Sequence, residues 1–237
     1  MKIEILYPEV ANLYGDLQNI TYLAACDSKI KVVKTSLNEK PKFVSQDIAL
    51  VYMGTTTESG QELIRDALKP YVKDLKKRIK ENKAILFTGN AIEILCEYIE
   101  QDDKKIKMLG LYPFHAKRVM NKRYNSLWLG EYEDMKLVGF KSQFSHLYGD
   151  NSNNYLFKTI RGDGINLETK LEGIKDHNLY ATYVIAPLLI CNPDFAKYML
   201  KLIGIKNPKL KCEEIAYESY NQRLHDFQEE KRNYRYS

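Results

Sequence analysis

The amino-acid sequence predicts an α/β protein with a mainly parallel central sheet, helices on both faces of that sheet, and an antiparallel extension. The first observation is that segments 47–52 and 84–88 are apolar at nearly every position, as in strands that helices cover on both faces. The second is that such strands alternate with segments of helical periodicity. The third is that shorter strand-like segments with polar turns follow residue 106. At 237 residues, the chain is long enough to bury one α/β core.

The first half of the chain alternates expected strands and helices. Pro8 ends the first strand, because its ring fixes φ and removes an N–H donor. The first helix has Leu13, Leu17 and Ile20 on one side. Pro70 is expected to break the second helix. The expected strands are 2–6, 30–35, 47–52 and 84–88; the expected helices are 12–25, 61–82 and 91–98; residues 53–60 form a loop.

The second half predicts shorter strands and two further helices. Asn192 is expected to cap one helix, with Pro193 at its first position, and that helix runs to about Ile203. We expect residues 1–212 to form one domain and residues 213–237 to add a C-terminal helix that packs on the domain or on a partner. Its apolar stripe is Tyr217, Tyr220, Leu224 and Phe227. The expected strands are 109–119, 126–129, 136–140, 155–160 and 180–185, with a loop at 150–154.

Composition and charge exclude several classes of function. The net charge of +5 comes from 36 basic and 31 acidic residues, and most lysines lie in mixed runs such as KDLKKRIKENK, which indicate solvated helix faces rather than a nucleic-acid surface. MKIEIL is too short and polar for a signal peptide. The apolar run 184–191 contains Pro187 and is far shorter than the ~20 residues of a spanning helix, so we expect no membrane span and a cytoplasmic location. We expect no cofactor and no metal, because Cys26, Cys96, Cys191 and Cys212 show no CxxC spacing.

The turn after the strand 84–88 is the first candidate for a functional site. Gly89 and Asn90 stand between that strand and the expected helix, and glycine tolerates the positive φ that a sharp turn needs. This is the layout of a nucleophile elbow, where a helix N-terminus would face an oxyanion. Gly89 itself has no side chain to react, so an ordinary strand-to-helix turn is the alternative.

Three further motifs give the elbow a family context. They are YPEVANLYGD at 7–16, GFKSQ at 139–143 and ATYVIAPLL at 181–189. Together they resemble the class I glutamine amidotransferases of the cobyric acid synthase (CobB/CobQ) type, closest to the GatD-type subunits of lipid II isoglutaminyl synthase. That family reads LYxxxxNLYGDxxN, a GGG loop, ICGGYQ, GFENH and GTYLHGPLL, and order and spacing match over nearly the whole chain. The resemblance implies a three-layer, flavodoxin-like fold.

The departures from the family motifs affect the positions that carry the catalytic side chains. In the family a cysteine thiolate attacks the glutamine amide, a histidine transfers the proton, and ammonia passes to a synthetase, which for the closest relatives is the Mur-ligase-like MurT. The nucleophilic cysteine aligns with Gly89, the catalytic histidine with Ile185 and the GFENH histidine with Gln143. The glycine loop survives only as Gly54. The resemblance therefore implies that nucleophile and base are both absent.

No other side chain replaces them in the sequence. Cys96 lies seven residues after Gly89, ~10.5 Å along a helix, and the threonines 55–57 have no adjacent base. Thr88 is expected to point elsewhere, and His146, the one histidine near a family site position, is expected on the surface. The candidate pocket comprises Gly54, Thr55, Thr56, Asn90, Lys122, Arg123, Gln143 and Tyr183, and the N-terminal motif contributes Asn12, Tyr14, Gly15, Asp16 and Asn19.

Some of these residues have two interpretations. Lys122 and Arg123 align with the place where the close relatives carry an arginine for the substrate carboxylate; they hold an anion or are two solvated basic residues. Asp16 and its turn present groups to a ligand, or Asp16 stabilises the first turn of a helix.

The first functional hypothesis is a degenerate, catalytically inactive amidotransferase-like protein. It would act as a binding or regulatory subunit of a Mur-ligase-like (MurT-type) or other ATP-dependent synthetase, or as a small-molecule sensor. The alternative is an enzyme with a changed activity in the former glutaminase pocket. An open cavity beside Gly89 favours the enzyme, and a cavity filled by side chains such as Ile185 and Phe87 favours the binding role. We expect an elbow at Gly89 with the Asn90 amide directed into a small pocket.

Overall fold

A six-stranded sheet forms the centre of the protein in the computed structural model, which describes residues 1–185, 187–229 and 231–236. Its strand order is β13-β14-β4-β3-β1-β2. Neighbouring strands are parallel except β13 and β14, so the predicted mainly parallel sheet is confirmed. β4 lies in the middle, as expected for its fully buried sequence. The strands are β1 (Lys2–Leu6), β2 (Lys31–Thr35), β3 (Leu50–Met53), β4 (Ala84–Thr88), β13 (Ile174–Asp176) and β14 (Leu179–Thr182).

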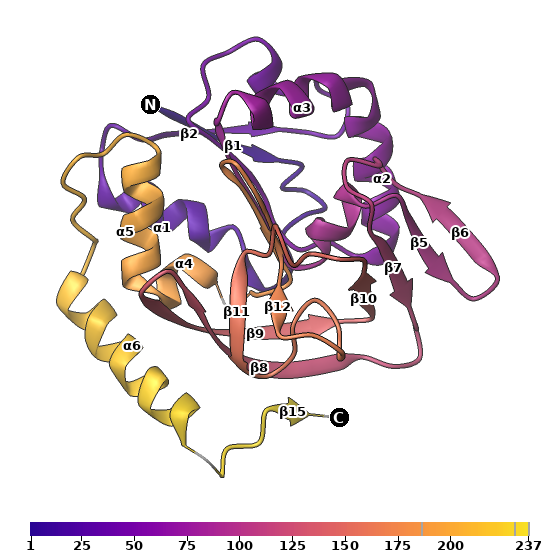
Figure 1. The fold of residues 1–237 in the computed structure, drawn as a ribbon. Helices are drawn as coiled ribbons and strands as arrows, with labels where there is room; N and C mark the ends of the chain where they lie inside the picture. Colours follow the sequence, from indigo (N-terminus) through magenta and orange to yellow (C-terminus); the bar gives the residue numbers. More distant parts are fainter. Residues whose placement is uncertain (186, 230, 237) are drawn as a thin grey trace.

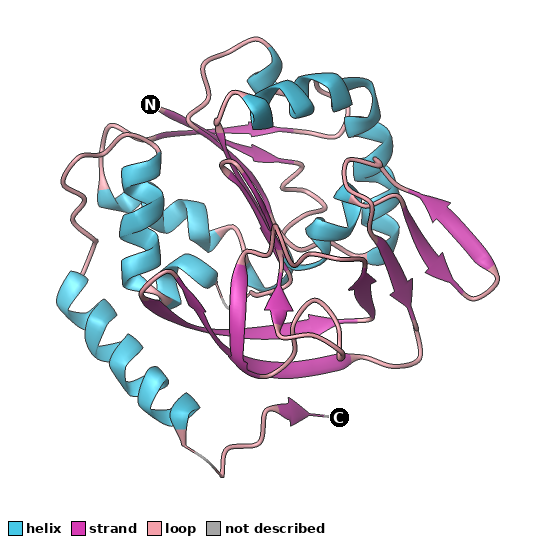
Figure 2. Cartoon of the chain, viewed as in Figure 1, coloured by secondary structure: helices cyan, strands magenta, loops and turns pink. Residues whose placement is uncertain are grey.

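Helices cover both faces of this sheet and complete the three predicted layers (Figures 1 and 2). One face buries Ile64 and Ile79, from α2 and α3, against Val51 and Phe87 of the sheet. The other face packs α1, α4 and α5 against β1 and β14. These helices are α1 (Gln18–Cys26), α2 (Glu58–Leu68), α3 (Val72–Lys80), α4 (Leu188–Cys191) and α5 (Pro193–Leu202), with short 3-10 helices η1 (Leu13–Gly15), η2 (Lys42–Val44) and η3 (Lys69–Tyr71).

Two further sheets extend the domain beyond the central sheet, and their strands pair antiparallel except β5 with β7. A four-stranded sheet has the order β10-β7-β5-β6, and a five-stranded one joins β12, β11, β8 and β15, with β9 on β8. The hairpin β5–β6 was missed by the sequence analysis, because three of the four β6 residues are lysines and hide the strand pattern. The strands are β5 (Tyr98–Gln101), β6 (Lys104–Lys107), β7 (His115–Arg118), β8 (Tyr124–Tyr132), β9 (Met135–Gln143), β10 (Ser145–Tyr148), β11 (Phe157–Arg161) and β12 (Leu171–Glu172).

The expected helix after the elbow is wrong. Gly89–Leu95 forms a 3-10 helix, η4, and the chain is already a strand at Tyr98. All seven residues of η4 are buried, so side-chain periodicity carries no information about a solvent-facing side. The expected strand 180–185 also ends early, at Thr182, and Ile185 makes an isolated bridge with Phe140. The expected strand 109–119 is regular only from His115 to Arg118.

The C-terminal segment is helical only in its first part. α6 (Glu213–Gln228) packs three residues of the predicted stripe, Tyr220, Leu224 and Phe227, next to Leu129 and Val138 of the five-stranded sheet. The chain then extends to β15 (Arg235–Tyr236), which pairs with β8. Of the expected segment 213–237, positions 230 and 237 lie outside the described residues, as does position 186 of the third family motif.

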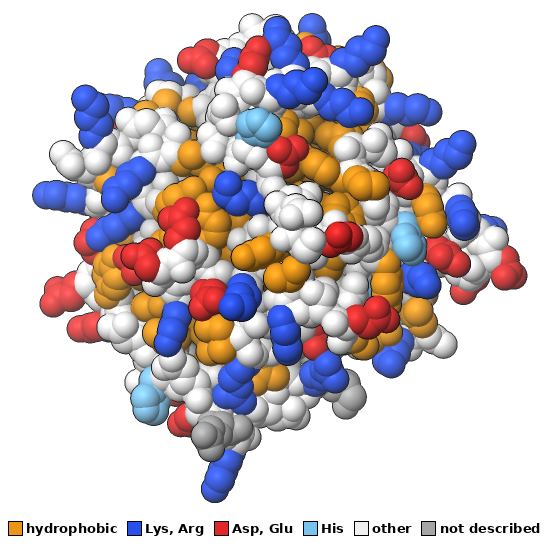
Figure 3. Space-filling view, in the orientation of Figure 1, with side chains coloured by type: hydrophobic (Ala, Val, Ile, Leu, Met, Phe, Trp, Pro, Cys, Tyr) orange, Lys and Arg blue, Asp and Glu red, His pale blue; other side chains and the backbone are white. Residues whose placement is uncertain are grey.

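The surface carries mixed charge. Basic and acidic side chains are interspersed over the face in Figure 3, without a single-sign area covering it. None of the helices in the described part of the chain combines the length and the apolar character that a membrane span needs.

Asn192 is the N-cap residue of α5 and Pro193 its first residue, as the sequence predicts, but the Asn192 side chain makes no capping hydrogen bond. Instead its Oδ1 accepts from Val138 N at 2.8 Å, and its Nδ2 donates to Val138 O at 2.9 Å and Leu188 O at 2.8 Å. A buried side-chain amide therefore bridges β9 and α4 across the core.

Asn192→Ala and Asn192→Ser should each lower the free energy of unfolding by about 2 kcal/mol or more, because either change leaves the buried Val138 backbone groups without partners. Serine is a good helix cap, so a capping role would let Asn192→Ser behave like the wild type. Urea denaturation of both variants distinguishes these roles. A serine variant as stable as the wild type would contradict the bridging role.

Candidate functional site

The turn at Gly89 has the elbow shape but no space for a side chain. Its φ is +62°, in the left-handed region that glycine adopts without strain. A Cβ placed on Gly89 would lie 2.0 Å from Thr55 Oγ1 and 2.9 Å from Thr55 Cγ2, closer than non-bonded atoms approach. Thr55 therefore occupies the volume that a side chain at the nucleophile position would need.

Asp16 holds Thr55 in that place. Its Oδ2 accepts hydrogen bonds from Thr55 N at 2.9 Å, Thr55 Oγ1 at 2.5 Å and Thr88 Oγ1 at 2.9 Å. The carboxyl group is fully buried, and burial raises its pKa. Its Oδ1 has no hydrogen-bond partner among the described residues. Thr88, expected to point away from the site, thus belongs to the same cluster.

The N-terminal motif divides into a buried and an exposed half. Tyr52 donates to the Asp16 backbone oxygen at 2.8 Å, and the Asn19 amide reaches the same oxygen at 3.0 Å and accepts from Leu189 N at 2.8 Å. Asp16 and Asn19 therefore tie the first helix to the sheet. Gly54 stands close to them, since a Cβ there would be 3.0 Å from Asp16 Cβ. The exposed half of the motif is Asn12, Tyr14 and Gly15.

Asn90 connects the elbow to the former glycine loop. Its Oδ1 accepts from Thr56 N at 3.0 Å, and its Nδ2 donates to Thr56 O at 2.8 Å. Its backbone oxygen accepts from Gln61 Nε2 at 2.7 Å. Thr55, Thr56, Gly89 and Asn90 are all buried, so the elbow is covered by the loop. The side-chain amide of Asn90 is used in this contact with the loop.

A buried ion pair lies behind the elbow, where the family motif ICGGYQ ends in glutamine and this chain has Glu93. Its carboxylate is fully buried. Oε1 accepts from Ser145 Oγ and from Tyr183 OH at 3.0 Å. Oε2 accepts from Gln61 Nε2 at 3.0 Å and lies 3.3 Å from an Arg118 guanidinium nitrogen. All four donors are buried, so this carboxylate is bound inside the protein.

A second buried ion pair includes a residue at another family motif. Lys141 stands at the glutamate of GFENH, and its Nζ pairs with Glu172 and donates to the backbone oxygens of Asp163 at 2.8 Å and Gly164 at 2.7 Å. Burial lowers the pKa of Lys141, against the raising effect of Glu172. Sequence reasoning missed Glu93, Arg118, Lys141 and Glu172 as members of the site. The available signal was the charge change at the two motif positions, each of which requires a buried partner.

His146 is buried, so its expected surface position is wrong. Its ring contacts the Tyr124 ring edge to face, with centroids 4.2 Å apart. Burial, followed by the positive charge of Lys141, lowers the pKa of His146 to about 4. Gln143, at the family histidine of GFENH, donates to Ser145 O at 2.6 Å, and its Oε1 has no hydrogen-bond partner in the described part of the chain.

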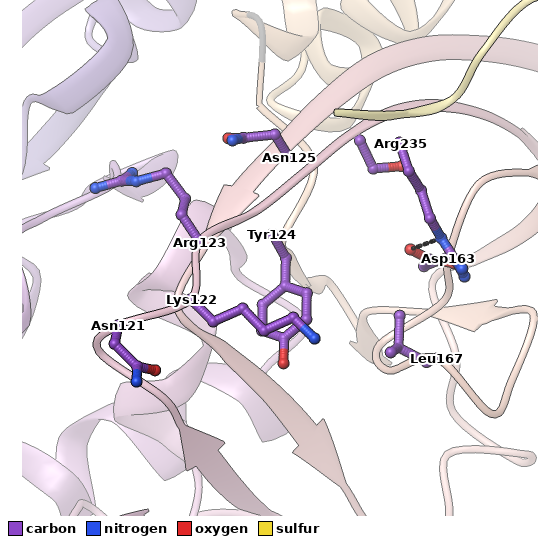
Figure 4. Close-up of a pocket in the computed structure, with 9 residues that line it drawn as sticks. Asn121, Lys122, Arg123, Tyr124, Asn125, Asp163, Leu167 and Arg235 are labelled. Carbon is purple, nitrogen blue, oxygen red and sulfur yellow. Dashed lines mark hydrogen bonds and ion pairs between the residues drawn. The ribbon is translucent and has the colours of Figure 1, made fainter. Parts of the chain in front are cut away.

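Other candidate groups are separated from the elbow. Arg123 NH1 donates to Tyr14 OH at 2.5 Å and Ser142 Oγ at 3.2 Å, and its guanidinium covers the Phe144 ring. The Lys122 side chain points away from Arg123 and lines a cavity of about 550 Å³ at the start of β8 (Figure 4). The Cys96 thiol donates to Glu93 O at 2.7 Å, and burial raises its pKa, so it is no replacement nucleophile.

This geometry is that of a glutamine amidotransferase fold with a glycine at the tip of its elbow. Residues 2–188 match the family model of the CobB/CobQ-like glutamine amidotransferase domain, and the chain belongs to that family.

Two curated relatives carry the same description, lipid II isoglutaminyl synthase (glutamine-hydrolyzing) subunit GatD. The Staphylococcus aureus protein is 27% identical over 193 residues, which are 80% of this chain and 79% of that protein. The Streptococcus pneumoniae protein is 23% identical over 215 residues, which are 87% and 81% of the two chains. A crystal structure of a glutamine amidotransferase shares the fold, with a TM-score of 0.56 and 14% identity, covering 86% of this chain and 99% of that one.

Acidification should destabilise the protein through His146. Its pKa falls from 6.5 to about 4 on folding, so between these pH values the unfolded chain binds the extra proton. The free energy of unfolding therefore decreases as pH falls through this window, by about 3 kcal/mol from this group. His146→Phe keeps a ring against Tyr124 and should remove this part of the pH dependence, measured by urea denaturation from pH 7 to pH 4. Parallel stability curves for variant and wild type would contradict the assignment.

Proposed function

We propose that this protein is a catalytically inactive member of the glutamine amidotransferase family that acts as a binding or regulatory subunit in the cytoplasm. The observation that supports this most directly is the contact between Thr55 and Gly89. The thiol has been lost and the volume beside it has been filled by a threonine from the former glycine loop. A substrate amide would meet neither a nucleophile nor room to approach one.

The buried ion pairs support the same proposal. The Glu93 carboxylate is bound by four donors of the chain itself, and Lys141 is bound by Glu172 and two backbone oxygens. Side chains that bind each other so completely offer few groups to a substrate. The alternative of a changed activity in the same pocket requires an open cavity beside Gly89. The side chain that closes it is Thr55, and not Phe87 or Ile185 as expected.

We further propose that the partner is a Mur-ligase-like (MurT-type) synthetase, because the relatives in S. aureus and S. pneumoniae are named as subunits of a synthase. Four large apolar side chains are exposed in two segments that adjoin Arg123, one through a contact and one through the chain, and we propose that they form a docking surface. The hydroxyl of Tyr14 contacts Arg123 directly, and Val119 and Met120 belong to the segment that leads into it. This partner surface comprises Leu13, Tyr14, Val119 and Met120, each 37–44% exposed. Exposed apolar groups that cluster in this way are typical of interaction sites.

Restoring glutaminase chemistry should require three changes. The wild type should release no ammonia from glutamine above background. Gly89→Cys alone should form little adduct with a glutamine-analogue electrophile, because the new side chain collides with Thr55. Thr55→Gly with Gly89→Cys should make the thiol accessible, and adding Ile185→His should accelerate the reaction by about 100-fold or more through general-base assistance.

Cys26 is partly and Cys212 more fully accessible to solvent, so both thiols would also react with the electrophile. Peptide mass spectrometry is therefore used to show which cysteine carries the adduct. Urea denaturation of each variant shows that it is folded. Ammonia release by the wild type would overturn the proposed inactivity. If Gly89→Cys alone reacts as fast as the triple variant, neither Thr55 nor Ile185 has the role assigned to it.

The partner surface predicts a difference between two exposed apolar residues. Met120→Glu should abolish co-purification with the co-expressed Mur-ligase-like synthetase of the same organism, since it places a charge in the apolar contact. Ile215→Glu is the matched control, because Ile215 is 64% exposed on α6 and lies outside this surface. Absence of a complex with the wild type, or equal loss with both variants, would contradict the partner surface.

A further inference from the structure

The cavity at the start of β8 is built by three separate parts of the chain (Figure 4). One wall is the segment that enters β8, the second is the turn after β11, and the third is the C-terminal strand. Its lining comprises Asn121, Lys122, Arg123, Tyr124, Asn125, Ser126, Asp163, Leu167 and Arg235. Gly89 is not part of it, so the following inference goes beyond the proposed function and is independent of it.

The lining has more positive than negative charge. Three of its residues are basic, whereas Asp163 is the one acidic residue among them. Arg235 binds Asp163 through two hydrogen bonds, of 2.6 Å and 3.3 Å. Its side chain is 65% exposed, and a guanidinium has five N–H donors, so donors remain for further contacts. The Lys122 ammonium forms no ion pair or hydrogen bond with another described residue; it lies 5.0 Å from the centre of the Tyr124 ring.

Unused polar groups and an apolar side chain converge on this cavity. The Tyr124 hydroxyl makes no hydrogen bond with any described residue, and Figure 4 shows it beside the Lys122 ammonium, on the side that faces Leu167 and Asp163. Leu167 is 48% exposed. An apolar wall with a few convergent polar donors is the usual composition of a small-molecule site.

We propose that this cavity binds a small organic anion, with its phosphate or carboxylate group between Lys122 and Arg235 and its apolar part on Leu167. A lysine ammonium and an arginine guanidinium are the side chains that bind such groups most strongly. The Tyr124 hydroxyl donates to the same anionic group.

His146 lies close enough to the cavity to report on it. Its ring lies against the Tyr124 ring. Burial and Lys141 are the main causes of its lowered pKa; among the cavity residues, Asp163 raises this pKa, whereas Arg235 and Lys122 lower it to a smaller extent. The charges of the cavity therefore act on this ring, and a bound anion would change their sum, so the His146 ring is a spectroscopic reporter for the site.

The C-terminal strand completes the site. Arg235 is placed opposite Ser126 by the pairing of β15 with β8. The preceding segment is held by Arg161, whose guanidinium donates to the backbone oxygens of Phe227, Glu229 and Arg232. The part of the chain that matches the family ends at residue 188. The site therefore combines a cation from the family domain with one from outside it.

Phenyl phosphate is a suitable probe, because it joins an anionic group to an apolar ring. Inorganic phosphate and phenol test the two parts separately, and benzoate distinguishes carboxylate from phosphate ligands. Binding to the full-length protein is measured by calorimetry and by the His146 ring signals in NMR spectra. We expect phenyl phosphate or benzoate to bind at millimolar concentration and to shift the His146 signals, inorganic phosphate to bind more weakly, and phenol not to bind.

Single substitutions locate the site. Lys122→Gln and Arg235→Gln should each weaken binding about tenfold, the size expected for one charge-assisted hydrogen bond. Leu167→Ser should weaken binding of phenyl phosphate and leave that of inorganic phosphate unchanged. Lys117→Gln is the matched control, because Lys117 also lies 5.0 Å from a tyrosine ring, that of Tyr148, but outside the cavity.

Two results would overturn the inference. One is that neither phenyl phosphate nor benzoate binds the wild type at millimolar concentration. The other is that Lys117→Gln weakens binding as much as Lys122→Gln, which would show general attraction of anions to a basic surface. Folding of each variant is checked by urea denaturation. Neither result bears on the proposed inactivity of the elbow, which is argued from residues outside this cavity.

Discussion

The contact between Thr55 and Gly89 constrains the region around the elbow. Protein interiors are packed without spare volume, so the two positions cannot both carry a side chain: a Cβ at 89 would lie 2.0 Å from the threonine hydroxyl. Asp16 fixes the threonine by accepting from its N–H and its hydroxyl. The glycine at position 89 and the threonine at position 55 are thus two parts of one packing arrangement.

The two buried ion pairs also make distant positions depend on each other, through charge instead of volume. A buried charge without a partner costs several kcal/mol, of the order of 3–5 when one member of a pair is removed. Glu93 accordingly lies beside Arg118, and Lys141 beside Glu172. The charged residues at these two motif positions are thus each matched by a buried partner elsewhere in the chain. Removing one member of either pair would leave the other charge buried and unpaired.

The sequence predicted features that depend on local patterns. The apolar residues 84–88 identified the central strand, and the glycine after them identified the turn. It did not predict features set by long-range packing: η4 is fully buried, so its side chains carry no periodic signal, and Thr55 meets Gly89 across 34 positions. The pairing of Arg235 with Asp163 spans 72 positions. Such contacts depend on how the elements pack in three dimensions, and no pattern within one element encodes them.

The elbow turn forms with glycine at its tip, and the reason lies in the backbone conformation. A cysteine at φ +62° would be strained, and strain of this kind is retained at sites where chemistry needs it. Glycine adopts this conformation without strain and keeps the turn. Asn90 joins the turn to the loop 53–60 through two hydrogen bonds with Thr56. The turn is thereby a structural junction between β4 and α2, since Gln61 of α2 also donates to the Asn90 backbone oxygen.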